Sequence, residues 1–101
     1  MNITILTPDR EIFFGSIVSV KVPGSMGQFQ VLKNHAPIVS SLDKGEVTVV
    51  TAAGEYRFYD TETSTIVTEA QPGRTLTFHI AGGFIEVLNN EISLLARGLK
   101  R

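Results

Sequence analysis

The chain has 101 residues, 43% of them hydrophobic, which suits one globular domain with a buried core and excludes a disordered tail or a fibrous protein. Its formal net charge is −1, so it lacks the basic surface of a nucleic-acid binder. The absence of cysteine excludes disulfides, thiolate metal sites and a thiol nucleophile. No apolar run approaches the ~18 residues of a membrane span, and the first residues lack the pattern of a signal peptide. We therefore expect a soluble domain that meets a membrane only through a partner.

The first part of the chain alternates apolar and polar residues, as β-strands do. Strands are expected at residues 3–5, 11–15 and 16–22. A glycine bend separates the second strand from the third. In the third strand, Val18, Val20 and Val22 are expected to face the core, whereas Ser19 and Lys21 face water.

A tight chain reversal follows the third strand. Pro23, Gly24 and Gly27 favour this turn, which leads into a strand around residues 29–31. The turn carries Met26, a flexible apolar side chain at a place where a loop normally has a polar one. Met26 is therefore a candidate contact with another protein.

The same alternation predicts further strands at residues 38–42, 46–51, 55–59, 66–67, 75–80, 84–88 and 91–96. Residues 52–54 are expected to turn the chain and make a second hairpin. Residues 60–74 have little apolar periodicity and are interpreted as a partly exposed excursion. Gly82-Gly83 indicates a bulge or a close backbone approach. Asn89-Asn90 is a good two-residue hairpin loop, because asparagine tolerates positive φ.

No window of the sequence shows sustained helical spacing with caps. Nine or ten short strands with turns at regular intervals predict a single all-β domain over residues 1–101. We expect a β-sandwich of two antiparallel sheets with no C-terminal helical hairpin.

Few residues suggest chemistry. His35, Ser40 or Ser41, and Asp43 have the composition of a hydrolase triad, but no nucleophile-elbow glycines flank either serine, and loop and turn roles account for them. The glycines of the first turn lack the lysine and helix of a phosphate-binding loop. His79 lies on the strand face opposite the apolar residues and is expected to be an exposed or interface side chain, not a metal ligand. We therefore expect no catalytic, cofactor-binding or metal site. The remaining candidate function is contact with another protein through surface residues.

Besides Met26, the apolar pair Ile38 and Val39 is a candidate for packing against another protein. Filling of the domain's own core is the simpler explanation of these two residues. The residues alone thus indicate a small β-sandwich interaction module.

Three stretches of the chain carry a further signal. They are Phe14-Gly15, then Val22-Pro23-Gly24-Ser25-Met26-Gly27-Gln28-Phe29 running through His35-Ala36-Pro37 to Lys44-Gly45, and finally Ala81-Gly82-Gly83-Phe84-Ile85-Glu86-Val87 with residues 90–96. In these stretches the sequence resembles the amino-terminal β-sandwich domain of the epsilon subunit of the rotary F-type ATP synthase. Order and spacing agree with that family over nearly the whole chain except residues 60–74.

The resemblance implies a non-catalytic central-stalk subunit without a cofactor. Such a subunit links the gamma subunit to the membrane-embedded c-ring during ATP synthesis, as a peripheral part of the complex at the cytoplasmic face of the inner membrane. The loop that matches the family's ring-facing loop comprises Ser25, Met26, Gly27 and Gln28. The family often has an acidic residue where Gln28 stands, so a hydrogen bond would replace a charge contact.

The positions that match the family's gamma-facing residues are Thr7, His35, Ile38 and Ser40. In this interpretation His35 is a packing and hydrogen-bonding residue, not a catalyst.

The chain departs from the family pattern in three places. Lys33-Asn34 replaces the usual proline and glycine before His35, and residues 60–74 are additional, forming either an edge hairpin or a further contact. The sequence also stops at Arg101, whereas many members continue into a two-helix arm. We therefore expect a short form without the inhibitory arm and its ATP-binding motif. The coupling ion, proton or sodium, stays open, and the alternative function is a free-standing β-sandwich module that binds a ligand or a protein.

Overall fold

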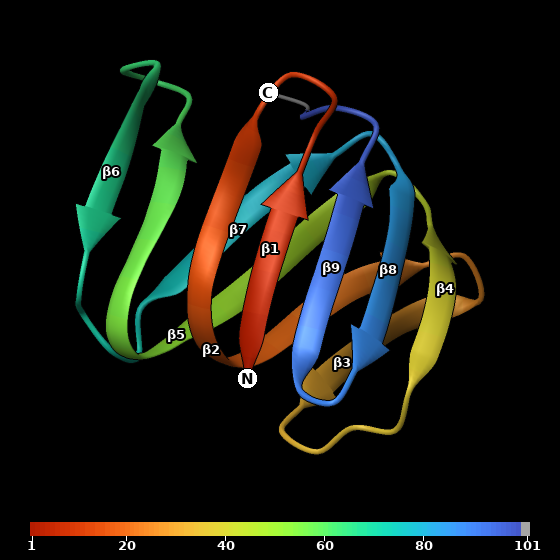
Figure 1. Ribbon diagram of the computed structural model, residues 1–101. Helices are drawn as coiled ribbons and strands as arrows, with labels where there is room; N and C mark the ends of the chain where they lie inside the picture. The colour runs from red at the N-terminus through yellow and green to blue at the C-terminus, as the bar shows by residue number, and fades with distance from the viewer. Residues whose placement is uncertain (100–101) are drawn as a thin grey trace.

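All regular secondary structure in the computed structural model, which describes residues 1–99, is β-strand (Figure 1). The strands are β1 (Asn2–Leu6), β2 (Glu11–Gly24), β3 (Gly27–Leu32), β4 (Ile38–Leu42), β5 (Gly45–Asp60), β6 (Thr65–Glu69), β7 (Thr75–Ile80), β8 (Gly83–Leu88) and β9 (Glu91–Ala96). The all-β prediction and the expected number of strands are confirmed. Within these residues there is accordingly no helix long and apolar enough to cross a membrane.

Two long strands, β2 and β5, pass from one layer of the sandwich into the other. The first part of β2 pairs with β1 and with the end of β5, and its later part pairs with β3 and with the start of β5. The front layer therefore has the order β6-β5-β2-β1-β9-β8-β4, and the back layer has the order β3-β2-β5-β7 (Figure 1). Hydrogen bonds run continuously through all nine strands, so the two layers are one sheet folded over itself.

A bulge in β2 changes which residues point inward. The register between β2 and β5 shifts between Gly15 and Ser19, and the inward positions change there from odd to even numbers. Val18 is consequently exposed and Ser19 is buried, so the expected orientation of these two residues was wrong. The expected break after Gly15 was also wrong, because β2 continues through it.

A larger bulge replaces the hairpin that was expected around residues 52–54. Ile17 is opposite Thr51 whereas Gly15 is opposite Tyr56, so β5 uses more residues than β2 over the same length. Gly54, with φ of 111°, lies in this extra stretch. The chain therefore bends here without reversing, and β5 enters the front layer.

The irregular stretch at residues 60–74 forms the outer part of an edge hairpin. β5 extends to Asp60, turns, and pairs antiparallel with β6 at the margin of the front layer. Thr51 holds the following turn: its Oγ1 donates to the Gln71 carbonyl at 2.7 Å and accepts from the Arg74 amide at 2.9 Å. The alternative of an added edge hairpin is thus confirmed.

One strand pair departs from the antiparallel expectation, because β1 runs parallel to β9. On its other side β1 pairs antiparallel with β2, so the first strand of the chain lies between the second and the last. The Asn89-Asn90 loop joins β8 to β9 with φ values of 51° and 63°, as expected for a two-residue hairpin loop.

The core lies between the two layers. It consists mainly of branched aliphatic residues, with an aromatic cluster where β2 and β5 meet. In that cluster the ring of Phe13 stacks on Tyr56, with centroids 5.8 Å apart, and meets the edge of Phe78 at 6.2 Å.

Candidate interaction surface

The turn between β2 and β3 holds Met26 in solvent. Gly24 pairs with Gly27, so Ser25 and Met26 form the two-residue tip, and Met26 is 101% exposed. A Cβ on Gly24 would lie 2.7 Å from a ring carbon of Phe29, so only glycine fits there. All four residues of the expected ring-facing loop, Ser25 to Gln28, are exposed.

Four hydrogen bonds fasten this turn to β4 and to the loop after it. The Ser25 amide donates to the Ser41 carbonyl at 3.0 Å, and the Asp43 amide donates to the Pro23 carbonyl at 2.8 Å. The Ser41 hydroxyl donates to Ser25 Oγ at 3.0 Å, and the Ser25 hydroxyl donates to the Asp43 carboxylate at 3.2 Å. The turn is therefore a supported projection that presents Met26 in one place.

These hydrogen bonds give the side chains of Ser41 and Asp43 a structural role, so no catalytic role is needed to account for them. His35 does not join them: its Nδ1 donates to the Ala36 carbonyl at 2.7 Å. The residue types of the triad therefore occur in the chain, but the structure does not bring them together in triad geometry.

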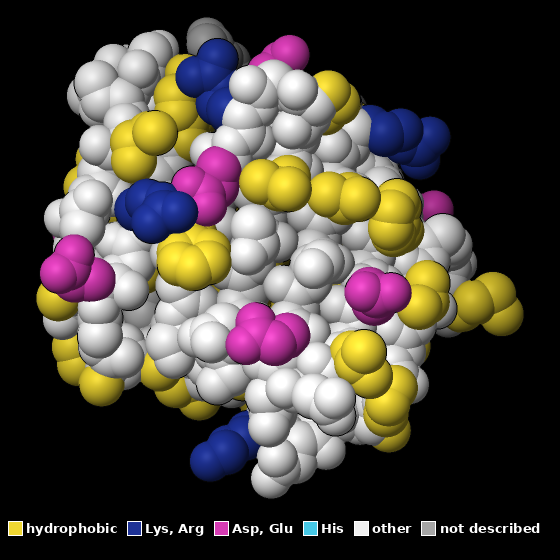
Figure 2. All heavy atoms as spheres, in the orientation of Figure 1, with side chains coloured by type: hydrophobic (Ala, Val, Ile, Leu, Met, Phe, Trp, Pro, Cys, Tyr) yellow, Lys and Arg dark blue, Asp and Glu magenta, His cyan; other side chains and the backbone are white. Residues whose placement is uncertain are grey.

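An apolar row crosses the outer face of the front layer. Leu6 lies beside Leu95 in the parallel register of β1 and β9, and Phe84 lies beside Leu95 in the antiparallel register of β8 and β9. These three side chains, hereafter the apolar row, are 37–46% exposed. Figure 2 shows hydrophobic side chains gathered across this face. The next strand contributes Ser41 opposite Phe84, so the row leads to the Met26 turn.

A charged pair borders the row on the side of β2. Glu11, which pairs with Leu6 in the sheet, accepts two hydrogen bonds from Arg57 at 2.8 and 3.1 Å. The hydrogen bond to Glu11 raises the pKa of Arg57 above its ordinary value. The guanidinium lies 4.5 Å from the centroid of Phe14 and covers that ring. The charged pair thus marks the β2 border of the apolar row, and beyond it Phe14 and Ile66 are also exposed.

The outer face of the back layer has the opposite character. Its outward positions on β2, β3, β5 and β7 are mostly polar and include Lys21, Gln30, Glu46, Thr48, Thr77 and His79. His79 is exposed, as its alternation with Phe78 and Ile80 predicts. Val18 on β2 and Leu32 on β3 are exposed apolar exceptions. The front layer, with its contiguous apolar row, is the face better suited to protein contact.

The expected gamma-facing residues lie at two places. Thr7 follows β1 beside the apolar row, and its hydroxyl donates to the Arg10 carbonyl at 3.3 Å. His35 lies at the other end of the front layer, because the neighbouring Asn34 exchanges hydrogen bonds with Asn90 in the β8–β9 turn. The structure does not bring Thr7 and His35 together, and they mark opposite ends of one face.

On β4, residues that face the core alternate with residues that face solvent. Ile38 and Ser40 are half-buried on the inward side with Leu42, and Ile38 packs against the core. Val39 points outward and is 71% exposed. Of the apolar pair considered in the sequence, Val39 thus supplies the surface and Ile38 supplies packing.

The sequence patterns did not predict the apolar row. Its members stand next to core residues in strands that are apolar on both faces, such as Leu95 beside Leu94. The signal that could have indicated it is a strand with apolar residues on both faces in a sheet that has one face in solvent.

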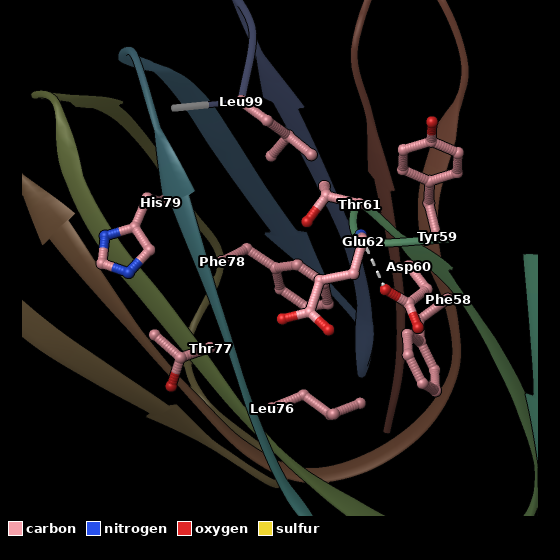
Figure 3. A pocket seen from close by; sticks show the side chains of 10 residues that line it. All are labelled: Phe58, Tyr59, Asp60, Thr61, Glu62, Leu76, Thr77, Phe78, His79 and Leu99. Atoms are coloured by element: carbon pink, nitrogen blue, oxygen red, sulfur yellow. Dashed lines mark hydrogen bonds between the residues drawn. The ribbon is translucent and has the colours of Figure 1, made fainter. Parts of the chain in front are cut away.

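A small pocket opens between β7 and the end of β5 (Figure 3). Its volume is about 200 Å³, and Phe58, Leu76 and Phe78 form apolar walls. In Figure 3 the ring of His79 lies on the other side of β7 from these walls. Among the described residues that line it, no hydrogen bond joins a hydroxyl group to a carboxylate or to the imidazole. Among the described residues there is also no group of three or more His, Asp or Glu side chains that could hold a metal ion.

Residues 1–66 match the family model described as ATP synthase, Delta/Epsilon chain, beta-sandwich domain. The ATP synthase epsilon chain of Chlorobaculum tepidum is 39% identical over 94 residues, covering 93% of this chain and 85% of the relative. That of Caulobacter vibrioides is 32% identical over 96 residues, covering 95% of this chain and 88% of the relative. The chain spans only 60% of the length of the epsilon chain of Pelotomaculum thermopropionicum, to which it is 30% identical.

Solved structures show the same fold. A chain of the Euglena gracilis mitochondrial ATP synthase (OSCP/F1/c-ring) superposes with a TM-score of 0.68 and 18% identity, covering 97% of this chain and 51% of that one. A chain of the Tetrahymena thermophila mitochondrial ATP synthase (central stalk/c-ring) gives 0.63 and 18%, covering 99% and 65%. The family match over the first two thirds of the sequence and the two relatives covered over most of their length lead to one conclusion: the chain belongs to the ATP synthase delta/epsilon chain β-sandwich family.

Proposed function

We propose that this chain is a non-catalytic epsilon subunit of the central stalk of an F-type ATP synthase, where it links the gamma subunit to the c-ring during rotary ATP synthesis. The observation that supports this most is the match to epsilon chains over 85% and 88% of their own length. The two solved relatives in fold are ATP synthase assemblies that contain a c-ring.

The ring contact is assigned to Ser25, Met26, Gly27 and Gln28. These residues project from the back layer beside β4, and their turn is fastened by the hydrogen bonds to Ser41 and Asp43. A fastened tip suits a part that transmits torque, because a mobile loop would yield under load. Gln28 offers an amide for hydrogen bonding in place of a charge.

The gamma contact is assigned to the outer face of the front layer. The apolar row supplies the buried centre that a stable interface needs, and Thr7 and His35 border it at opposite ends. Val39 extends the apolar surface on β4, whereas Ile38 and Ser40 support it from the inward side.

In this role the subunit needs no cofactor and contacts the membrane only through the complex. It would lie peripherally on the side of the membrane where gamma is, which in bacteria is the cytoplasmic face of the inner membrane.

The test is to mix the purified chain with the gamma subunit of the same synthase and to analyse the mixture by gel filtration. We expect a co-eluting complex that then binds detergent-solubilised c-ring. Separate elution of two folded proteins would contradict the proposal. In that case a thermal-shift screen that finds a stabilising small ligand would favour a free-standing binding module.

A further inference from the structure

Four neighbouring strands of the front layer carry negative charge only. β1, β9, β8 and β4 contain no lysine or arginine, and their only charged residues are Glu86 and Glu91. The same strands bear the apolar row and the exposed Val39. In Figure 2 the lysine and arginine side chains in view surround this region and do not enter it. A partner that covers these strands therefore meets an apolar surface with carboxylates and no cation.

Glu86 lies among the exposed apolar side chains. Along β8 it alternates with Phe84 and Leu88, which are exposed on the same face. On the neighbouring strand β4, Val39 lies directly opposite it. Leu95 on β9 is a diagonal neighbour, because it pairs with Phe84. A partner that buries these four apolar side chains must bury the carboxylate as well.

The carboxylate of Glu86 has no partner among the described residues. The two ion pairs in this part of the chain involve other carboxylates. By contrast, Glu91 lies at the start of β9 and accepts a hydrogen bond from the Asn2 side chain at 3.2 Å. Burial of an ionised carboxylate without a partner is strongly unfavourable. An interface on this face therefore needs a cation opposite Glu86, and none of the residues that the structure describes supplies it.

A hollow beside Glu86 gives such a cation a place. Its volume is about 230 Å³, and the apolar Pro37, Val39 and Leu88 line it together with Glu86. Arginine suits this lining, because its aliphatic stem packs on apolar walls while its guanidinium donates two parallel hydrogen bonds to a carboxylate. A guanidinium is also more weakly hydrated than the ammonium group of lysine, so it leaves water more easily.

We infer that an arginine side chain of the gamma subunit occupies this hollow and pairs with Glu86, which makes Glu86 a specificity-determining residue for gamma. The inference rests on the proposed function, which assigns the outer face of the front layer to gamma. It adds the position and the sign of the charge contact. The apolar row supplies contact area, whereas the pair fixes where gamma lies on it, because a displaced partner would leave both charges buried and unpaired.

Isothermal titration calorimetry of the whole chain with gamma tests the pair. Glu86→Gln keeps the size of the side chain but removes its charge, so it should weaken binding by at least about tenfold. Two controls remove the same charge elsewhere: Glu91→Gln on the same face and Glu46→Gln on the outer face of the back layer. Each should change the dissociation constant by no more than about threefold. All three carboxylates are exposed, so circular dichroism should show the native fold in every variant.

Arginine-specific modification tests the identity of the partner group. Gamma is treated with phenylglyoxal in saturated complexes with the native chain and with Glu86→Gln, and its modified residues are located by mass spectrometry. We expect one gamma arginine to be protected in the native complex and to react in the variant complex. The absence of such an arginine would overturn the inference.

The same titrations separate this inference from the proposed function. Equal weakening by Glu86→Gln and Glu91→Gln would overturn the inference, because the carboxylates would then act only through the overall negative field of the face. Binding of gamma by the native chain would in that case leave the proposed function standing. A folded native chain that does not bind gamma would contradict both.

Discussion

Gly15 lies directly against Tyr56 at the point where β2 leaves the front layer. The two residues are opposite each other in the β2–β5 register, and a Cβ on Gly15 would stand 2.4 Å from the Tyr56 Cβ. Tyr56 has no room to retreat, because its side chain is 2% exposed and its ring stacks on Phe13. The glycine is therefore required by the space between two strands.

We expect Gly15→Ala to lower the free energy of unfolding by about 1–3 kcal/mol, the usual cost of overpacking a core. Urea denaturation followed by circular dichroism measures this. Gly98→Ala is the matched control, since a Cβ there meets no atom within 4 Å, and its effect should be within about 0.5 kcal/mol. Similar effects of the two substitutions would show that β2 and β5 separate easily at this point.

Thr51→Val tests the anchor of the edge hairpin. The change keeps the shape of a fully buried side chain but removes the hydroxyl that bonds the Gln71 carbonyl and the Arg74 amide. Two backbone groups then lose their partner, so the free energy of unfolding should fall by about 1–3 kcal/mol. Hydrogen exchange of the Gly73 amide, which donates to the Thr51 carbonyl at 2.7 Å, should also become faster.

The control for Thr51 is Thr77→Val on the exposed outer face of the back layer. Its hydroxyl makes only a 3.4 Å contact with Thr48, so stability should change by no more than about 0.5 kcal/mol. Unchanged exchange at Gly73 in Thr51→Val would mean that the turn does not depend on this hydroxyl.

The strands and tight turns were predictable because each depends on neighbouring residues. Alternation located the strands, and the Asn89-Asn90 loop followed from the tolerance of asparagine for positive φ. The bulges in β2 and β5 were not predictable in this way. A bulge changes the inward face by one position, and nothing near Val18 signals it, because Val18 and Ser19 fit a strand in either orientation.

The parallel pairing of β1 with β9 could not be predicted from local sequence patterns either, because it joins residues 89 positions apart, such as Asn2 and Glu91. Of the candidate surface, Met26 was identified because a lone apolar residue in a turn is unusual. The apolar row was not, because an exposed leucine in the middle of a strand has the same local pattern as a buried one. Only the register that places Leu6, Leu95 and Phe84 side by side makes them a surface.

If the apolar row is the centre of the gamma contact, Leu95→Glu should weaken gamma binding by at least about tenfold, because it places a charge in a desolvated interface. The side chain is already partly exposed, so the fold should persist. Isothermal titration calorimetry with gamma measures the dissociation constant. Thr77→Glu, on the polar face of the back layer, should leave it unchanged, and equal losses in both variants would exclude the front layer as the contact face.

Met26→Glu tests the ring contact without disturbing the domain. The native side chain touches solvent only, so thermal stability of the isolated subunit should stay the same. In the reconstituted synthase the carboxylate would have to enter an apolar contact, and coupling should weaken. We therefore expect ATP-driven ion pumping to fall relative to ATP hydrolysis, whereas Met26→Leu, which keeps an apolar tip, retains the native ratio. Because the turn is fastened through Ser25 and Asp43, the glutamate cannot swing away from the ring easily. Normal pumping by Met26→Glu would therefore mean that the c-ring contacts another part of the subunit.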